Sequence, residues 1–237
     1  MGQYIDEAVN SILQQTFQDF EIIIVNDGST DKETNKILNN YNKPEIKVIT
    51  TENRGRISAR NTGIENSKGK YIFPLDADDK TDLTYLEKAI NIIENNSDIG
   101  IVYSQAEFFG ARQGVWNLPP YSFPQILVLN CIFNSALFRK SDWQQVGGYN
   151  LNMKYGKEDR DFWLSIIESG LKPYRIEEIL FYYRVVDKTT DEGMTDFQKI
   201  YSYLMLFYNH KKLYLKNLPY VFKNLVLEVI RKKLSNR

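Results

Sequence analysis

The sequence of 237 residues contains one cysteine, so an internal disulfide and any metal site built from several cysteines are excluded. That cysteine, Cys131, lies in the apolar run Ile126–Phe138. No apolar run approaches the ~20 residues that a membrane-spanning helix needs. Residues 1–4 also lack the basic and then apolar pattern of a signal segment. We therefore expect a cytoplasmic protein.

The sequence also has no net charge, because 30 Lys and Arg residues balance 30 Asp and Glu residues. Bulk charge therefore gives no reason to expect a nucleic-acid partner. The charge is uneven, since residues 196–237 carry nine Lys and Arg against Asp196 and Glu228. Helical periodicity predicts two amphipathic helices in this basic tail, at about Asp196–Leu206 and Leu218–Lys233.

Two interpretations of the basic tail stay open. Its lysines and tyrosines suit peripheral contact with an anionic membrane, which would place the protein at the inner membrane face. Alternatively, the helices form a cap that packs on the sheet and turns a solvated basic face outward. His210, the only histidine of the sequence, is expected at the surface.

Short β-branched runs alternate with helical patterns along the rest of the chain. The predicted strands are Phe20–Val25, Ile46–Thr50, Tyr71–Leu75, Ile99–Tyr103, Ile132–Phe138 and Ile179–Arg184. The predicted helices are one through Ile5, Val9, Ile12 and Leu13, then Lys32–Tyr41, Ile57–Ser67, Thr84–Glu94, Ser141–Val146 and Asp159–Ser169. This alternation predicts an α/β fold with a mainly parallel sheet flanked by helices. Ligands of such folds bind at the carboxyl ends of the strands.

We expect one α/β domain over residues 1–195, followed by the basic tail at 196–237. This domain has a first part at about 1–103 and a second part at about 104–195. A Gly- and Pro-rich stretch after Ser104 is predicted to be a mobile loop. Trp116 and Tyr121 in that stretch either stack on a sugar or pack back on the domain.

An acidic segment follows the strand Tyr71–Leu75. Asp76, Asp78 and Asp79 place carboxylates at the end of a rigid strand, where they suit Mg²⁺ or Mn²⁺. The alternative is an acidic turn that caps the next helix, above all for Asp79 and Asp82. A calcium-binding EF-hand loop is disfavoured because Thr81 stands where that loop needs glycine.

Asp27-Gly28-Ser29 and Arg60-Asn61 are predicted to lie at the same edge of the sheet. Asp27 and Arg60 could bind a nucleotide base and its phosphates, or they could form a structural ion pair. Glu158 and Asp159 begin a helix, where the helix dipole favours the ionised form of a general base. The alternative for these two acidic residues is an N-cap.

Taken together and in order, these motifs resemble those of family 2 glycosyltransferases of the GT-A fold. They are Asp27-Gly28-Ser29, Arg60-Asn61, Leu75-Asp76-Ala77-Asp78-Asp79, Gly147-Gly148-Tyr149 and Glu158-Asp159. The resemblance covers about Gly2 to Arg184, and it implies that the part at about 1–103 binds the nucleotide and the part at about 104–195 the acceptor. It implies inverting transfer of a sugar from a nucleotide-diphosphate sugar, a UDP-sugar, to a hydroxyl group of a glycan or a lipid-linked glycan.

The resemblance also implies a role for each matching residue. Asp27 and Arg60 would bind the uracil end of the donor, and Asp76 its ribose. Asp78 would bind Mn²⁺ or Mg²⁺, and Asp159 would be the catalytic base. The residues implied on the acceptor side are Gly147, Gly148 and Glu158, with Trp116 as a candidate beside them.

The sequence departs from the family pattern at two places. The apolar first strand of the family is absent, which predicts a gap between the strands Phe20–Val25 and Tyr71–Leu75 and a loss of stability. Val186 stands where the family often has a metal-binding histidine. Both departures keep open an alternative function as a catalytically impaired nucleotide-sugar or glycan-binding module. A third hypothesis is another metal-dependent nucleotide enzyme, such as a nucleotidyltransferase.

Overall fold

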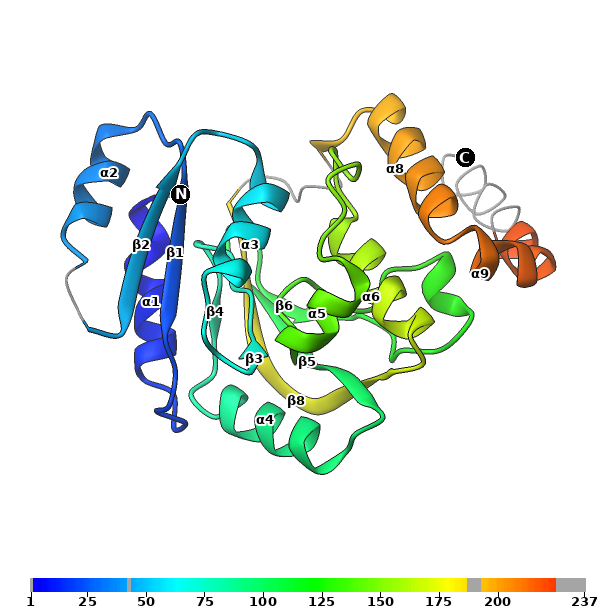
Figure 1. The fold of residues 1–237 in the computed structure, drawn as a ribbon, viewed down its shortest axis with the longest axis horizontal. Coiled ribbons are helices and arrows are strands. Elements are labelled where there is room, and N and C mark those ends of the chain that lie inside the picture. The colour runs from blue at the N-terminus through cyan, green and yellow to red at the C-terminus, as the bar shows by residue number, and fades with distance from the viewer. Residues whose placement is uncertain (1, 42–43, 187–192, 225–237) are drawn as a thin grey trace.

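A computed structural model describes residues 2–41, 44–186 and 193–224 (Figure 1). Its helices are α1 (Ile5–Leu13), α2 (Lys32–Asn39), α3 (Arg56–Glu65), α4 (Tyr85–Asn95), α5 (Lys140–Val146), α6 (Glu158–Glu168), α8 (Asp196–Asn209) and α9 (Lys211–Lys216). Its strands are β1 (Ile22–Asp27), β2 (Ile46–Thr51), β3 (Tyr71–Ile72), β4 (Lys80–Thr81), β5 (Ile99–Gly110), β6 (Gly114–Trp116), β7 (Leu137–Arg139) and β8 (Lys172–Val185). Residues 218–224 are also helical.

The strands form two separate sheets. Strands β1 and β2 pair in parallel, while the six-stranded sheet has the order β3-β7-β5-β8-β4, with β6 paired to β5. The two longest pairings, β1–β2 and β5–β8, are parallel, and the shorter ones are antiparallel. An α/β fold is confirmed, and the parallel arrangement holds for its longest pairings.

The division between the sheets falls between β1 and β3. Strand β1 pairs with β2 and strand β3 with β7, and within the described residues no strand bridges β1 to β3. This is where the missing first strand was expected to leave a gap. Figure 1 shows β1, β2, α1 and α2 together at one side of the molecule, with the six-stranded sheet beside them.

The two sheets have cores of very different size. The β1–β2 sheet packs on α1 and α2 through four buried apolar residues, Ile5, Val9, Leu38 and Ile46. The opposite face of β1 packs on α3, where Gly63 leaves room for Val25. The six-stranded sheet is covered by a much larger core that includes Phe138, Phe162, Trp163 and Phe181. Most of the burial that stabilises the fold therefore surrounds β5 and β8.

The structure corrects the predicted end of the strand that begins at Ile99. Strand β5 continues through Ser104 to Gly110 and turns back into β6, so this part of the predicted loop is a hairpin. Ser104, Ala106 and Phe108 are buried while Gln105 and Glu107 are partly exposed. This alternation is a strand signal that the nearby glycines obscured. Strand β8 is likewise longer than predicted, and β7 is shorter.

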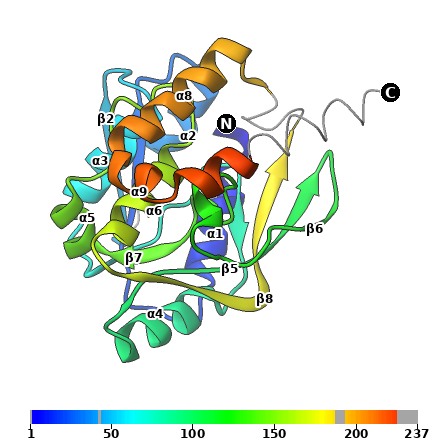
Figure 2. The ribbon, with the colours of Figure 1, turned by 90° about the vertical axis from the view of Figure 1, so that its right-hand side faces the viewer.

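The tail packs against the domain through one face of its helices (Figure 2). Leu206 and Tyr214 are buried there, and His210 is only 2% exposed. The expectation of a surface histidine was therefore wrong. Its ring nitrogens lie 2.7 Å from Glu168 Oε2 and 3.2 Å from Asp161 Oδ1, both on α6. Residues 225–233 of the second predicted tail helix lie outside the described residues.

Candidate active site

A cluster of ion pairs joins α3, the loop after β3 and the start of α6. Arg60 donates from Nη2 to Asp76 Oδ1 and from Nη1 to Glu158 Oε1, each at 2.7 Å. Arg56 adds two hydrogen bonds to Glu158, at 2.6 and 3.0 Å. The side chains of Arg60 and Glu158 are only 13% and 7% exposed. The cluster therefore fixes three segments that are far apart in the sequence.

Charge within this cluster explains the pKa of Glu158. Burial acts to raise it, but the hydrogen bond from Arg56 and the charge of Arg60 hold the pKa below its usual range. Arg60 in turn has a raised pKa, because the charges of Asp76 and Glu158 outweigh its burial. Glu158 and Arg60 are therefore both ionised at neutral pH.

Asp159 lies next to this cluster but is not neutralised by it. Burial, followed by the negative charge of Glu158, raises the pKa of Asp159 to about 6. Its Oδ1 accepts the backbone N–H of Arg160 at 2.7 Å, and its Oδ2 accepts Asn130 Nδ2 at 3.0 Å. Two adjacent carboxylates thus have pKa values that are pushed apart, as is common where one of them acts as an acid or base.

The start of α6 has unusual backbone geometry. Lys157 precedes Glu158 with φ 65°, and it is the one residue other than glycine with positive φ in the described part of the chain. It is also the N-cap position, so neither Glu158 nor Asp159 is an N-cap. That alternative was wrong, and both carboxylates lie in the first helical turn. Strained backbone is frequent at functional sites.

Asp27 lies at the end of β1, and its carboxylate holds the loop before α3. It accepts the backbone N–H groups of Arg54 and Gly55 at 2.9 and 2.8 Å. The predicted ion pair between Asp27 and Arg60 is replaced by the pairs of Arg60 with Asp76 and Glu158. A role of Asp27 in base binding stays a prediction.

The acidic segment after β3 divides into residues with different surroundings. Asp76 pairs with Arg60, while burial and the charge of Asp76 raise the pKa of Asp78. Burial, with the charge of Asp76, raises the pKa of Asp79 to about 9, and Asp79 accepts the backbone N–H of Arg184 at 2.9 Å. Asp82 accepts the N–H and the hydroxyl of Thr84, so it stabilises the turn before α4, but the N-cap of that helix is Thr84 and not Asp82.

A divalent cation would fit at Asp78. Burial and the charge of Asp76 raise the pKa of Asp78, and a bound cation would offset both effects; Arg184 donates to the backbone carbonyl of Asp78 at 2.9 Å and not to its carboxylate. Across the described residues, no group of three His, Cys, Asp or Glu side chains is arranged to hold a metal ion. Val186, at the position of the family's histidine, is 49% exposed just after β8. A cation would therefore need phosphate oxygens of a ligand to complete its coordination.

The predicted acceptor-side glycines form a turn that is locked onto α3. Gly147 is the left-handed C-cap of α5, with φ 84°, and Gly148 has φ 78°. A Cβ on Gly148 would lie 3.0 Å from Trp143 and 3.1 Å from Asn61 Oδ1. Asn61 holds the turn by accepting the N–H and binding the carbonyl of Tyr149. These glycines thus position Tyr149 beside Arg60.

Trp116 packs back on the domain. Its ring stacks on Phe108 and Phe133, with centroids 5.1 and 6.0 Å apart, and contacts Tyr183. Of the two interpretations of Trp116, the contacts in this structure are those of a packed residue. Contact with a sugar stays a prediction.

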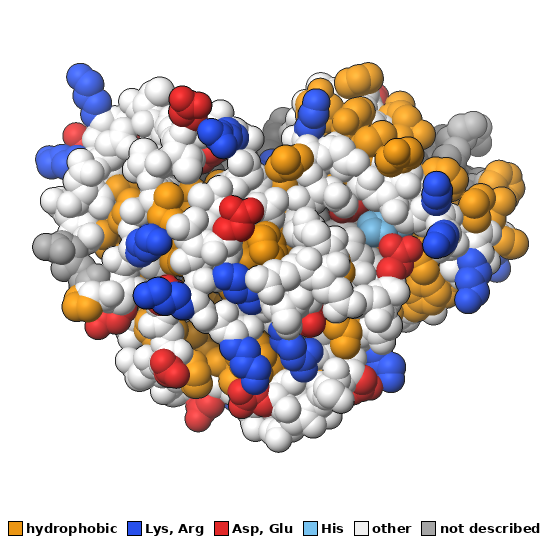
Figure 3. Space-filling view, in the orientation of Figure 1, with side chains coloured by type: hydrophobic (Ala, Val, Ile, Leu, Met, Phe, Trp, Pro, Cys, Tyr) orange, Lys and Arg blue, Asp and Glu red, His pale blue; other side chains and the backbone are white. Residues whose placement is uncertain are grey.

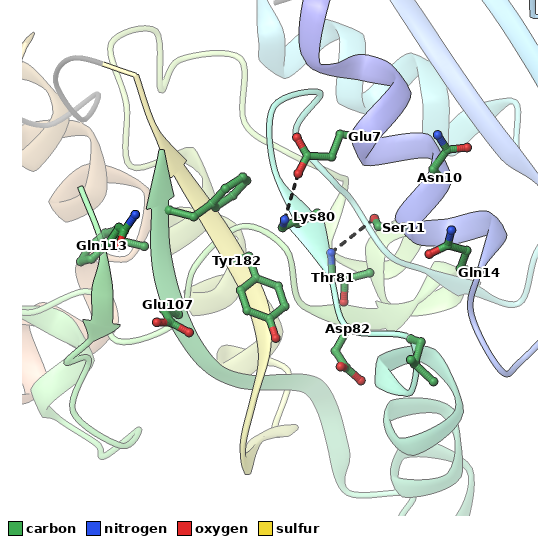
Figure 4. Close-up of a pocket in the computed structure, with 13 residues that line it drawn as sticks. Glu7, Asn10, Ser11, Gln14, Lys80, Thr81, Asp82, Glu107, Gln113 and Tyr182 are labelled. Atoms are coloured by element: carbon green, nitrogen blue, oxygen red, sulfur yellow. Dashed lines mark hydrogen bonds and ion pairs between the residues drawn. The ribbon is translucent and has the colours of Figure 1, made fainter. Parts of the chain in front are cut away.

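A cleft of about 860 Å³ lies elsewhere. It is lined by residues of α1, β4, β5 and β8, among them Glu7, Lys80, Glu107 and Tyr182 (Figure 4). None of the residues predicted for donor, metal, acceptor or base lines it. We place the candidate active site at the ion-pair cluster because the perturbed pKa values and converging carboxylates lie there.

Sequence reasoning missed three residues of the site. Asn130 touches the candidate base, Arg56 neutralises Glu158, and Arg184 contacts the acidic segment. Arg56 is adjacent to the predicted helix start, so helix periodicity could have placed it near Arg60. Asn130 lies in an irregular segment, and no periodic pattern could have indicated its contact.

Comparison with known proteins gives a matching family and several relatives. Residues 2–152 match the model of Glycosyl transferase family 2. The chain is 30% identical to the Uncharacterized glycosyltransferase MJ1057 of Methanocaldococcus jannaschii over 215 residues, which are 86% of this chain and 73% of that protein. It is 28% identical to the Chondroitin synthase of Escherichia coli over 205 residues, which are 84% of this chain and 29% of that protein.

Solved structures share the fold. TarS 1-349 of S. aureus in complex with UDP-GlcNAc aligns with a TM-score of 0.66 at 18% identity, covering 81% of this chain and 58% of that one. Mannosyltransferase PcManGT from Pyrobaculum calidifontis, in complex with GDP-Man and Mn²⁺, aligns with a TM-score of 0.62 at 18% identity, covering 81% and 56%. The chain thus spans less than two thirds of these structures. The GT-A fold is confirmed, and the chain belongs to glycosyl transferase family 2.

Proposed function

We propose that this glycosyltransferase moves a sugar from a UDP-sugar to a hydroxyl group of a glycan or a lipid-linked glycan, with inversion at the anomeric carbon. The observation that carries the proposal is Asp159, whose pKa of about 6 suits a general base, held beside the Arg60–Asp76 pair. Similarity to a chondroitin synthase supports a polysaccharide as the acceptor or product.

In this proposal the two sides of the site bind different substrates. Asp27 and Arg60 bind the uracil end of the donor, and Asp76 accepts a hydrogen bond from its ribose. Glu158, Gly147 and Gly148 support the acceptor side. Arg56 and Arg60 neutralise Glu158, whereas the neighbouring Asp159 accepts a hydrogen bond from Asn130 and from no arginine side chain. TarS and PcManGT, whose structures contain nucleotide sugars, support a donor of this class.

The reaction needs one proton transfer and one displacement. Asp159 takes the proton of the acceptor hydroxyl, and the hydroxyl oxygen attacks the anomeric carbon as its bond to the diphosphate oxygen breaks. UDP leaves with the electron pair of that bond, so the products are the new glycoside and UDP. Asp78 would bind Mn²⁺ or Mg²⁺, which offsets the charge of the departing diphosphate.

The test is UDP release with Mn²⁺ from a panel of UDP-sugars, with GDP-mannose as a comparison. We expect turnover with a UDP-sugar, and a loss of about 10²- to 10⁴-fold in kcat for Asp159→Asn, with donor affinity retained. Asp98→Asn, an exposed carboxylate paired with Lys172, is the matched control and should keep full activity.

Two results would contradict the proposal. Tight UDP binding without turnover in either protein would indicate a binding module. Release of pyrophosphate in place of UDP would indicate a nucleotidyltransferase.

A further inference from the structure

The two faces of the tail helices differ in a way that a simple cap does not explain. Their inner face is buried against the domain through Leu206, His210, Tyr214 and Val221. Their outer face carries large apolar side chains that are 57% to 67% exposed. We call these the outer stripe: Phe197, Ile200, Leu204, Tyr208, Leu215 and Phe222.

Along α8 the outer stripe is a row of side chains and not a scatter of single residues. Phe197, Ile200, Leu204 and Tyr208 follow one another at intervals of three and four residues, which places them along one side of α8. Nine of the sixteen large exposed apolar residues in the described chain lie between 197 and 222. Figure 3 shows hydrophobic side chains gathered over α8 and α9. A patch of this kind normally marks a binding surface.

The charges beside the stripe are of one sign. Residues 196–224 contain five lysines, at 199, 211, 212, 216 and 223, and a single acidic residue, Asp196. Figure 3 shows Lys and Arg side chains next to the apolar surface at α9. An apolar helical face flanked by lysines is complementary to a surface that offers both hydrocarbon and negative charge.

We propose that the outer stripe and its flanking lysines bind a membrane surface that contains anionic lipids. The apolar side chains enter the boundary between headgroups and acyl chains, and the lysines contact lipid phosphates. A second copy of the chain fits less well, because a twofold contact would bring the lysines of one tail against those of the other. Among the described residues, no helix has the length and hydropathy of a membrane span.

Helix α8, which carries four residues of the outer stripe, also contacts the start of α6, where the candidate base lies. Tyr203 of α8 lies beneath the cations of Lys157 and Arg160, at 5.0 and 5.9 Å from its ring centroid. These cations flank Glu158 and Asp159 in the sequence. A membrane bound at the stripe would therefore hold the acceptor side near lipid-linked glycans, a consequence that rests on the proposed function.

The experiment is sedimentation of the full chain with vesicles of phosphatidylcholine, alone or mixed with phosphatidylglycerol. We expect binding at least about tenfold tighter to the anionic vesicles, weakened by salt. Ile200→Ser/Leu204→Ser should weaken it at least about tenfold, and Lys211→Glu/Lys212→Glu should do the same. Because these side chains are exposed, the melting temperatures of the variants should stay near that of the parent.

Matched controls separate the stripe from general effects. Lys32→Glu/Lys36→Glu changes the net charge equally but on α2, and Leu83→Ser removes an exposed apolar side chain elsewhere. Both should bind as the parent does, and so should Asp159→Asn, which separates this proposal from the catalytic one. Equal binding by stripe variants and controls would overturn the proposal. A lack of binding to anionic vesicles, or a dimer that Ile200→Ser/Leu204→Ser dissociates, would do so as well.

Discussion

Glu158 and Asp159 are neighbours in the sequence, yet their surroundings differ sharply. Glu158 accepts hydrogen bonds from two arginines, whereas Asp159 accepts them from an amide side chain and a backbone N–H. The sequence motif alone cannot separate the two roles, because both residues lie in the first turn of the same helix. The two roles differ because α3 places Arg56 and Arg60 within hydrogen-bond distance of Glu158 and not of Asp159.

The raised pKa of Asp159 predicts an acidic limit to activity. The base must be deprotonated to accept a proton, so kcat should rise with pH, reach half of its maximum near pH 6 and level off about one pH unit higher. The measurement is the pH profile of kcat from UDP release between pH 4.5 and 8. A profile that is flat down to pH 5 would show that another group is the base.

Asn130 should act as a positioning residue for Asp159. Its Nδ2 donates to Oδ2 and so stabilises the charged form of the base. Asn130→Ala should lower kcat about tenfold and move the acidic limb of the profile to higher pH, with little change in the KM of the donor. Asn134→Ala, in the same irregular segment, is the control. An unshifted profile for Asn130→Ala would leave this residue with a structural role only.

At the scale of elements, α3 and α6 depend on Glu158 for their attachment. Glu158→Gln removes the negative charge that Arg60 and Arg56 face at the start of α6. Breaking a buried ion pair from one side typically costs about 3–5 kcal/mol, and Asp76 still pairs with Arg60, so we expect a loss of about 2–4 kcal/mol in the free energy of unfolding. Urea denaturation measures it.

Glu94→Gln is the matched control, since Glu94 pairs with Lys70 at 3.5 Å on an exposed surface. Such pairs contribute at most about 1 kcal/mol. Similar losses for Glu158→Gln and Glu94→Gln would contradict the structural role of the cluster.

Helices and strands were predictable where periodicity was strong. The apolar spacing of Ile5, Val9 and Leu13 gave α1 correctly, and β-branched residues gave β1 and β2 within two residues. The predicted strand ended at Tyr103, seven residues before the end of β5, because Gly110 and Gly114, which form the turn between β5 and β6, are residues typical of loops. Contacts between distant segments, such as Asn130 with Asp159, depend on tertiary packing that local pattern does not encode.

His210 makes the attachment of the tail dependent on pH. Its hydrogen bonds and charge interactions with Asp161 and Glu168 outweigh burial and raise its pKa above the usual value of 6.5. The sign follows from linkage: this contribution is fully present below pH 6.5 and is lost as pH rises through the folded-state pKa. The urea concentration at the unfolding midpoint of the parent should therefore decrease as the pH is raised from 6 to 8.5.

Asp79, whose pKa is raised to about 9, should lower the midpoint in the same direction over this pH range, so a variant is needed to isolate the contribution of His210. His210 is the only histidine in the sequence, and His210→Gln should make the fall in the urea midpoint smaller. An identical fall in His210→Gln would assign the effect to another group.

At the scale of the whole molecule, the two sheets should differ in stability. Strands β1 and β2 share a core of four buried residues with α1 and α2, while twenty-three buried residues pack in the largest core around β5 and β8. Local opening requires less free energy where less apolar surface is buried. The lobe of β1, β2, α1 and α2 should therefore open without unfolding of the larger sheet.

Hydrogen exchange measures this directly. Amides of 22–27 and 46–51, in β1 and β2, should exchange faster than those of 99–110 and 172–185, in β5 and β8. If Asp27 binds the base, UDP with Mn²⁺ should slow exchange in β1 and β2 more than in β5 and β8. Ligand linkage predicts about 2.7 kcal/mol of added protection when the free ligand is at 100 times its Kd. Equal protection of both sheets in the free protein would show one cooperative unit. Slowing confined to 71–79 and 158–168 would place the nucleotide at the ion-pair cluster without Asp27.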